Sequence, residues 1–414
     1  MNLAAILFAV VLGIQTYGPA AQMLREDPDR SGVNTHVYEF KDDKVTRAPR
    51  GYTPFYILHY GRHGSRTDTK VESYLAVEDI LSRAKEGGFL SEAGDSLLSE
   101  TKQVIAAHGG NPGHLTRRGE LEERELARRI FKKYRPVFRR GSRNIRVKSS
   151  NVPRVLVSMA CFTGELSKKA PKLDFTIETG EMIFAWINNS PSAEHKTAAL
   201  ALQDSMIKAI RVDSVSIYER LFTDPAKGKE LAPDADEFQH QIWTTGRIAT
   251  SSGLENNPLR FLPEEVVYKW WDVTNRYFYV RHSRSVEFWD NRMKQTVPLI
   301  EKVFQLADDA LASRKVSADL LFGHDYPLLA MAAWFGVEGV GDRLSFEEIP
   351  EKWSDPTNIP LASNMQMVFF KSRKKGAPIL VKFVYNGRER KLDGLEPVGG
   401  VFYKWDDLSR FRPE

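Results

Sequence analysis

The sequence predicts an α/β fold with a central, mainly parallel sheet flanked by helices, together with a helical cap insertion. Two observations predict this class. A strand followed by a loop and a helix recurs three times, which is typical of parallel sheets covered by helices. Between about residues 193 and 312, helical spacing dominates and strand signals are almost absent. With 414 residues, 42% of them hydrophobic and 27% charged, the chain is long enough for this globular architecture.

Each of the three units couples a strand to a helix that follows it: 55–60 with 71–84, 144–149 with 154–169, and 320–322 with 327–335. The first strand is a continuous apolar run ending at Gly61, which indicates burial on both faces. A long charged helix is also expected from Thr116, a suitable N-cap, to about Tyr134.

The end of the chain is predicted to be antiparallel. Strands are expected at 365–370 and 378–385, joined by a solvated basic turn around 371–375. Asn386-Gly387 is a strong signal for a two-residue hairpin turn, because both positions favour positive φ.

The first twenty residues have the features of a signal peptide. Residues 3–14 form an apolar run too short to span a bilayer comfortably, and small residues precede a cleavage expected after Ala20. The alternative is an N-terminal core helix. No later segment reaches 18 apolar residues, so no membrane contact is expected of the mature form. Cys161 is the single cysteine, and an exported chain without a disulfide fits a bacterial periplasm or bacterial secretion.

These observations divide the chain into three parts. Residues 1–20 are the predicted signal peptide, 21–170 with 313–414 the α/β catalytic core, and 171–312 the mostly helical cap. The aromatic stretch 268–279 has helical spacing, which favours core packing over the lining of a cleft. The net charge of +5 suits an anionic substrate and is too small to indicate nucleic-acid binding.

A cluster of chemically active residues, Arg62-His63-Gly64-Ser65-Arg66, directly follows the first buried strand. Open α/β sheets bind their ligands at this edge. The two arginines disfavour the protonated form of the histidine between them. A phosphate resolves the conflict, because guanidinium groups hold its oxygens while the neutral imidazole faces phosphorus. The alternative is a basic surface turn, which the preceding buried strand disfavours.

Two further polar sites follow the other predicted strands. His324 and Asp325 come directly after Gly323; the histidine can donate to a phosphoryl oxygen, and a protonated Asp325 can donate to a leaving alkoxide. Arg154 stands just past the strand 144–149. The structural alternatives are an N-cap role for Asp325 and a solvated surface position for Arg154.

Other residues near these motifs are interpreted as structural. Small side chains on the helix after Arg154, within the pattern Ser158, Ala160, Phe162 and Gly164, predict close packing on the sheet. His59 is expected to pack in the strand or to support His63, and Cys161 to fill the core. The remaining histidines are isolated and no pair has the helical spacing of metal ligands, so no metal is expected: His36, His108, His114, His195, His240 and His282.

In their order along the chain, these motifs resemble those of the histidine acid phosphatases, the second branch of the histidine phosphatase superfamily. The shared motifs are Arg62-His63-Gly64-Ser65-Arg66, Leu115-Thr116 with Gly119-Glu120, Arg154 with Ser158, Phe162 and Gly164, and His324-Asp325. The sequence looks closest to bacterial proteins similar to multiple inositol polyphosphate phosphatases, including residues 360–386. Those proteins usually carry His-Ala-Glu where this chain has the His-Asp of the wider acid phosphatase and phytase group.

The resemblance implies a phosphoglycerate-mutase-like core, no cofactor and a role for each motif residue. His63 would be the nucleophile that forms a phosphohistidine, and Asp325 would protonate the leaving group. Phosphate binding would fall to four residues: Arg62, Arg66, Arg154 and His324. The implied substrates are small phosphorylated molecules, including inositol polyphosphates such as phytate.

Three alternatives remain at this point. The chain could be a general-purpose acid phosphatase acting on small or sugar phosphates. It could be a mutase or phosphotransferase, which export disfavours because such metabolism is cytosolic. It could be a non-catalytic anion-binding protein on the same fold, although no catalytic residue is missing. Lys70 and the pair Arg117-Arg118 are candidates for contacts to phosphates that are not being cleaved.

Overall fold

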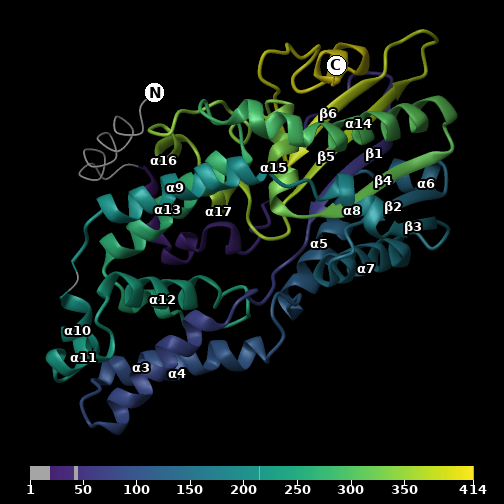
Figure 1. Ribbon diagram of the computed structural model, residues 1–414. Helices are drawn as coiled ribbons and strands as arrows, with labels where there is room; N and C mark the ends of the chain where they lie inside the picture. The colour runs from purple at the N-terminus through teal and green to yellow at the C-terminus, as the bar shows by residue number, and fades with distance from the viewer. Residues whose placement is uncertain (1–18, 42–44, 214, 414) are drawn as a thin grey trace.

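An eight-stranded mixed sheet forms the centre of the computed structural model, which describes residues 19–41, 45–213 and 215–413 (Figure 1). The strand order is β3-β2-β4-β1-β5-β6-β7, and β8 pairs with β6. The strands are β1 (Tyr52–Arg62), β2 (Asn144–Ser149), β3 (Asp174–Thr179), β4 (Val316–Gly323), β5 (Asn364–Ser372), β6 (Leu380–Tyr385), β7 (Arg388–Arg390) and β8 (Tyr403–Lys404). The first four in spatial order are parallel and the rest antiparallel, which confirms the predicted fold class.

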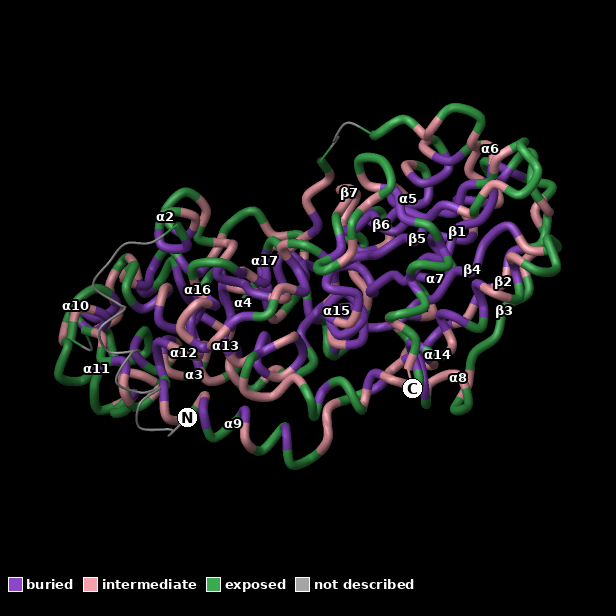
Figure 2. The backbone as a smooth tube through the Cα atoms, turned by 90° about the horizontal axis from the view of Figure 1, so that it is seen from above, coloured by how far each residue is buried: buried purple, intermediate pink, exposed green. Residues whose placement is uncertain are grey.

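Helices cover both faces of this sheet and leave its central strands buried (Figure 2). Along β1, Ile57 faces one hydrophobic core, while Tyr56 and Leu58 face the other. This alternation explains why the strand reads as a continuous apolar run. One face packs on α5 (Arg117–Lys133), α6 (Arg135–Arg140) and α7 (Pro153–Lys169), and the other on α8 (Glu181–Ile187), α14 (Trp289–Ser313) and α15 (Asp325–Trp334).

A helical lobe with its own core lies beside the sheet, at the lower left of Figure 1. Trp243, Trp270 and Trp271 are buried in this core, so the aromatic stretch packs as expected. The lobe comprises α2 (Pro19–Glu26), η1 (Pro28–Thr35), α3 (Glu72–Glu86), α4 (Glu92–His108), α9 (Ala193–Ala209), α10 (Ser216–Leu221), α11 (Pro225–Leu231), α12 (Ala235–Arg247), η2 (Pro258–Phe261) and α13 (Glu264–His282).

The lobes do not follow the boundaries expected at residues 171 and 312. β3 lies inside the expected cap, yet it extends the sheet by pairing with β2. In contrast, α3 and α4, from the expected core, pack in the helical lobe, with Val77 and Leu97 in its hydrophobic core. At the other boundary, α14 packs on the sheet through residues such as Val303.

The antiparallel end of the chain follows the prediction. β5 and β6 pair around the basic turn, and the turn residues Asn386 and Gly387 both have positive φ, 47° and 78°. The remaining short elements are α16 (Ile349–Lys352), α17 (Asp355–Asn358) and η3 (Trp405–Phe411).

Most of the predicted signal peptide, residues 1–18, lies outside the described residues. Ala20 is the second described residue and is buried in α2, in contact with the core of the helical lobe. No helix within 19–41, 45–213 and 215–413 combines the length and the apolar character needed to cross a membrane.

Candidate active site

The carboxyl ends of three neighbouring strands bring the predicted site residues to one edge of the sheet. Arg62, the last residue of β1, pairs in register with Gly323 at the end of β4. His63 therefore donates its backbone N–H to the Gly323 carbonyl, at 3.2 Å. The rings of His63 and His324 lie edge to face, with their centroids 5.4 Å apart. Arg154 enters from the first turn of α7, after the adjacent strand β2.

His63 is held as a neutral imidazole with one nitrogen left free for chemistry. Nδ1 lies 3.0 Å from the Gly64 carbonyl oxygen, which can only accept, so Nδ1 carries the proton. The lone pair of Nε2 is then available. Burial lowers the pKa of His63 well below its usual value, and the positive charges of Arg154 and Arg62 lower it further.

The three predicted arginines form a crowded cluster of positive charge. Burial lowers the pKa of Arg62 and of Arg154 to about 10, and repulsion from Arg66 adds to both shifts. Arg62 is completely buried, and its Nη1 donates to the Ile359 carbonyl at 2.7 Å. Such a cluster is costly without an anion, and a phosphate between the guanidinium groups would remove most of that cost.

Only part of this charge is compensated within the chain. Asp325 Oδ2 lies 2.9 Å from Nη2 of Arg62. The buried Asp68 lies 3.7 Å from Arg66 and 3.5 Å from Arg247 of α12, and it therefore also links the motif to the helical lobe. Among the residues that the structure describes, no carboxylate forms an ion pair with Arg154, although Asp325 acts on its pKa.

His324 and Asp325 begin α15, directly opposite His63. Burial lowers the pKa of His324 to about 3, so its ring is also neutral, and Nε2 lies 3.4 Å from the Ser150 hydroxyl. Asp325 accepts from Asn34 Nδ2 at 2.8 Å and from the Tyr326 N–H at 2.9 Å. Burial raises the pKa of Asp325, but Arg62 and then His324 outweigh it, so the free carboxyl is strongly acidic.

Backbone contact between two glycines fixes the loop that carries His63. A Cβ on Gly64 would lie 2.6 Å from the Gly119 carbonyl oxygen, and one on Gly119 would lie 2.7 Å from the Ser65 nitrogen. The N-terminus of α5 therefore presses directly against the loop. Thr116, the predicted N-cap, also donates its backbone N–H to the Ser65 carbonyl at 2.8 Å.

Glu122 is a supporting residue that sequence reasoning missed. Its carboxylate accepts from both the backbone N–H and the hydroxyl of Ser65, each at 2.8 Å. A signal for it existed, because Glu122 lies on the apolar stripe of α5, one turn before Leu126 and two before Ile130. A carboxylate on a buried helix face generally needs a specific partner.

Two further neighbours of Asp325 were also missed. Asn34 belongs to η1, in a distant part of the sequence, and no local pattern announces its contact. His282, set aside as isolated, lies at the end of α13 with its ring 5.5 Å from that of Tyr326 and acts electrostatically on Asp325.

The expected packing of α7 is correct for only half of the named residues. Ser158 and Phe162 are completely buried, and the Ser158 hydroxyl accepts from the Gly64 N–H at 3.1 Å. Ala160 is exposed, and a Cβ on Gly164 would meet nothing within 4 Å. These two residues lie on the outer face, because positions two apart on a helix point in different directions.

The structure agrees with the interpretation of His59 but not with that of His36. His59 is completely buried against Phe162, with ring centroids 5.1 Å apart, and burial lowers its pKa to about 3, so it packs as expected. His36, expected to be isolated, forms with Asp27 and Glu39 a group whose ligand atoms lie within 4.8 Å of one another. Arg30 pairs with both carboxylates of this group, so their charge is already compensated.

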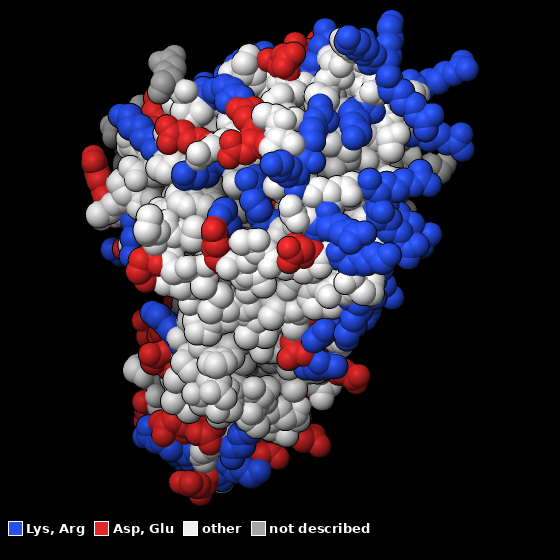
Figure 3. All heavy atoms as spheres, turned by 90° about the vertical axis from the view of Figure 1, so that its right-hand side faces the viewer, with Lys and Arg blue, Asp and Glu red and all other residues white. Residues whose placement is uncertain are grey.

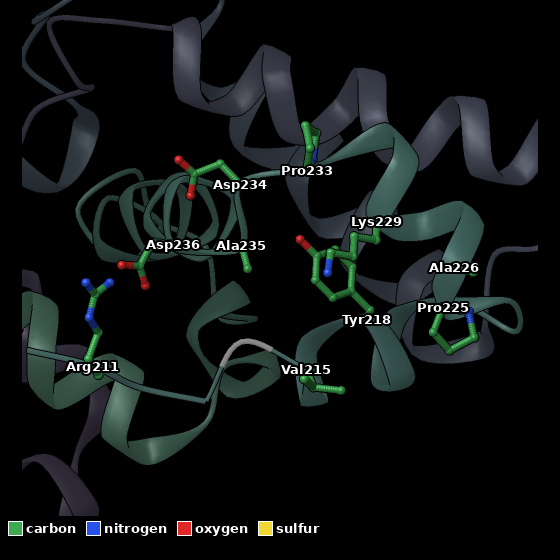
Figure 4. Close-up of a pocket in the computed structure, with 10 residues that line it drawn as sticks. All are labelled: Arg211, Val215, Tyr218, Pro225, Ala226, Lys229, Pro233, Asp234, Ala235 and Asp236. Atoms are coloured by element: carbon green, nitrogen blue, oxygen red, sulfur yellow. The ribbon is translucent and has the colours of Figure 1, made fainter. Parts of the chain in front are cut away.

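A hollow of about 690 Å³ lies in the helical lobe (Figure 4). It lies between α10, α11 and α12, and its lining includes Tyr218, Lys229 and Asp234. Figure 1 places α10 and α11 at the end of the lobe away from the sheet. The hollow therefore contributes nothing to the strand-end site.

Comparisons with known proteins identify solved structures with a similar fold. No protein-family model and no curated protein sequence matches this chain. The structure is similar to that of the Bifidobacterium longum multiple inositol polyphosphate phosphatase in its apo form, with a TM-score of 0.75, 17% identity and coverage of 92% of this chain and 96% of that one. Its complex with inositol hexasulfate matches with a TM-score of 0.72 and 15% identity, covering 92% and 98%.

Phytases show the same fold at a greater distance. The D. castellii phytase matches with a TM-score of 0.59 and 12% identity over 92% of this chain and 84% of that one. The Hafnia alvei phytase, in its apo form, matches with a TM-score of 0.55 and 12% identity over 88% and 97%. The resemblance inferred from the motifs is thus confirmed at the level of the fold.

Proposed function

We propose that this chain is a phosphomonoesterase that works through a phosphohistidine on His63, and that its substrates include inositol polyphosphates. The observation that carries the proposal is the state of His63. Its Nδ1 is committed to the Gly64 carbonyl, which leaves Nε2 free, and the positive charges of three arginines act on the ring. A neutral nucleophile surrounded by cationic anion-binding groups suits attack on phosphorus.

The first step transfers the phosphoryl group to the protein. The Nε2 lone pair of His63 forms a bond to phosphorus while the bond from phosphorus to the ester oxygen breaks. The carboxyl proton of Asp325 goes to that leaving oxygen. Arg62, Arg66 and Arg154 stabilise the equatorial oxygens, and His324 donates to one of them.

The second step returns the protein to its starting state. A water molecule attacks phosphorus, the N–P bond breaks, and the electron pair returns to Nε2 of His63. Asp325, now a carboxylate, accepts the proton of the attacking water. The products are inorganic phosphate and the free alcohol, and every residue regains its original charge.

Asp325 must gain a proton when substrate binds, because Arg62 and His324 keep its pKa low in the free protein. A bound phosphate dianion supplies negative charge to the same cluster. It offsets the guanidinium groups that stabilise the carboxylate, and therefore shifts the pKa of Asp325 upward. Binding thus prepares the acid that the first step requires.

The inositol polyphosphate assignment is supported by the fold comparison. The Bifidobacterium longum neighbour is a multiple inositol polyphosphate phosphatase, and one of its structures is a complex with inositol hexasulfate. That structure covers 92% of this chain. Arg247, which reaches Asp68 from the helical lobe, is a cation close to the motif that could meet a second phosphate. The alternative is a general acid phosphatase, in keeping with the His-Asp pair.

We further propose that the chain is exported through the signal peptide at residues 1–20, to a bacterial periplasm or medium. N-terminal sequencing of the mature protein tests this directly. Cleavage after Ala20 would leave a mature chain beginning at Ala21, with Leu24 kept in its buried position on α2.

A substrate panel tests the activity itself. Purified protein is assayed for phosphate release from p-nitrophenyl phosphate, sugar phosphates and phytate. We expect release from all three classes. Release from the small esters alone would favour the general acid phosphatase, and release from none would favour the non-catalytic anion-binding protein.

A further inference from the structure

Fifteen Lys and Arg side chains gather at the end of the sheet that lies opposite the catalytic edge. All fifteen are exposed, and the five short segments that contain them hold no Asp or Glu: 47–50, 135–143, 168–172, 314–315 and 371–375. We call this surface the basic pole. Figure 3 shows Lys and Arg crowded over the upper and right-hand part of this face.

The sheet register explains why segments so far apart in sequence meet here. Tyr52 at the start of β1 pairs with Ser372 at the end of β5, so the segment 47–50 adjoins the turn 371–375. Likewise Asn144 at the start of β2 pairs with Val316 at the start of β4. Helices α6, α7 and α14 end at the same edge. With about 4.8 Å between strands, the pole extends over roughly 20 Å or more from β3 to β6.

These charges are almost entirely uncompensated by acidic partners. Within the described part of the chain, Lys169 has an ion-pair contact, to Glu165 at 3.9 Å, and the other fourteen have none. Helix dipoles account for some cations, because Arg140 and Lys168 lie in the last turns of α6 and α7. They do not account for the β5–β6 turn or for the segment 47–50.

The pole also makes the distribution of charge along the chain strongly uneven. The whole chain has a net charge of +5, and the five segments of the pole carry fifteen positive charges and no negative one, so the rest of the sequence, which includes the exposed Asp174 at the start of β3, sums to −10. Neighbouring cations within a Debye length, about 8 Å at physiological salt, repel one another and cost stability. An extended anionic partner would relieve this repulsion, and the relief would contribute to the free energy of binding.

We infer that the basic pole is a docking surface for an anionic lipid bilayer, contrary to the expectation of no membrane contact that was drawn from the lack of long apolar segments. Its cations lie on turns and helix ends from five separate segments, which form a broad face. The one aromatic residue in these segments, Phe138, is buried, so the pole offers no platform on which nucleic-acid bases could stack. Each Lys or Arg near an anionic bilayer contributes about 1 kcal/mol, which makes fifteen of them ample for peripheral binding.

The orientation keeps the catalytic edge accessible. β1 has 11 residues and runs from the pole to Arg62, a length of roughly 35 Å at the usual rise of a strand. A protein docked through its pole would therefore present His63 to the solution rather than to the lipid. Binding and catalysis are expected to be independent, and the inference does not rest on the proposed activity.

Vesicle co-sedimentation tests this inference with the full chain. Vesicles of phosphatidylcholine are compared with vesicles that also contain phosphatidylglycerol. We expect binding only to the anionic vesicles, falling as the salt concentration rises. The pole variant carries four reversals in the β5–β6 turn: Lys371→Glu, Arg373→Glu, Lys374→Glu and Lys375→Glu. Its affinity for anionic vesicles should fall by roughly tenfold or more.

A control variant separates local from general charge effects. It carries the same number of reversals at exposed lysines away from the pole: Lys196→Glu, Lys208→Glu, Lys229→Glu and Lys294→Glu. Its affinity should change by about twofold at most, because these sites lie beyond the screening distance from the bilayer. Equal losses in the two variants, or no binding of wild type to anionic vesicles, would overturn the inference.

Two further measurements control for unfolding of the variant and for binding to another polyanion. Circular dichroism checks that the pole variant is folded; if it is not, Arg139→Glu with Arg140→Glu replaces it, and the same loss is expected. Duplex DNA serves as a second polyanion. Tighter binding to DNA than to anionic vesicles at equal salt would show that the pole recognises nucleic acid, and the membrane inference would be wrong.

Discussion

At the scale of single residues, the proposed mechanism depends on how neighbouring groups set the protonation states of His63 and Asp325. The Gly64 carbonyl sets the tautomer of His63, while burial and the arginines keep the ring neutral. Arg62 also approaches Asp325 directly, at 2.9 Å. The same guanidinium that would bind phosphate therefore controls the acidity of the proton donor.

The role of Asp325 predicts a dependence on the leaving group. In Asp325→Asn, hydrolysis of an alkyl phosphate should fall much more than that of p-nitrophenyl phosphate, because an alkoxide needs a proton and p-nitrophenolate scarcely does. The two losses in kcat should differ by more than about tenfold, or roughly 1.4 kcal/mol. Steady-state assays of both substrates decide it, and equal losses would exclude Asp325 as the donor.

The pH dependence follows from the same charges. Asp325 acts only when protonated, so kcat for an alkyl phosphate should be highest in acid and fall as the pH rises through the pKa of Asp325 in the complex. The negative charge of bound phosphate should raise that pKa above the low value of the free protein. Asp325→Asn should lack this falling limb. A wild-type optimum in alkali would contradict the assignment.

At the scale of elements, the catalytic loop is positioned by close contact between backbones. Gly119→Ala would drive a methyl group against the Ser65 backbone, 2.7 Å from its nitrogen and closer still to its carbonyl oxygen. Relief requires the loop and the N-terminus of α5 to separate. We expect kcat/KM to fall by at least about tenfold, as for other small displacements of reacting groups, and the melting temperature to drop.

Gly164→Ala is the matched control on the neighbouring helix. No atom lies within 4 Å of the added methyl group, and Ala is the better helix former. This variant should gain stability, by up to about 1 kcal/mol, and keep its activity. Thermal unfolding and kinetics of both variants test the contact; unchanged activity in Gly119→Ala would show that the approach of the two glycines is not needed.

The elements also show what sequence can and cannot predict. β1 and β2 were found because apolar or alternating residues precede polar motifs, and parallel pairing then places those motifs at one edge. β3 was missed because it is an edge strand whose residues, such as Asp174 and Glu178, are mostly exposed. The contact of Asn34 with Asp325 joins residues 291 positions apart, and no local pattern encodes it.

At the scale of the whole molecule, the distribution of charge corrects a simple argument from net charge. A net +5 was expected to suit an anionic substrate, yet fifteen of the cations lie at the basic pole, at the opposite end of β1 from His63. Attraction of a polyanion to the site therefore depends on the local cluster of Arg62, Arg66 and Arg154. The candidate Arg117 adds little, because it is exposed and already pairs with Glu120.

A polyanionic substrate predicts a salt dependence that distinguishes substrates, because Arg62, Arg66 and Arg154 hold the phosphate being cleaved and Arg247 can meet a second one. Phytate carries several phosphates that can each meet a cation, whereas p-nitrophenyl phosphate carries one. The KM for phytate should rise steeply with ionic strength, and that for p-nitrophenyl phosphate should change little. Measuring both KM values at low and high salt decides it. No hydrolysis of phytate, or an equally shallow response, would make the enzyme a general acid phosphatase.

The most direct test of the central claim is to trap the phosphorylated protein. Rapid quenching with labelled substrate should leave phosphate on wild-type protein in a form that is labile in acid and stable in base, as expected for a phosphohistidine. Peptide mapping should place it on His63, and His63→Ala should show neither the label nor turnover while keeping its fold. Label at another residue, or appreciable activity in His63→Ala, would contradict the account.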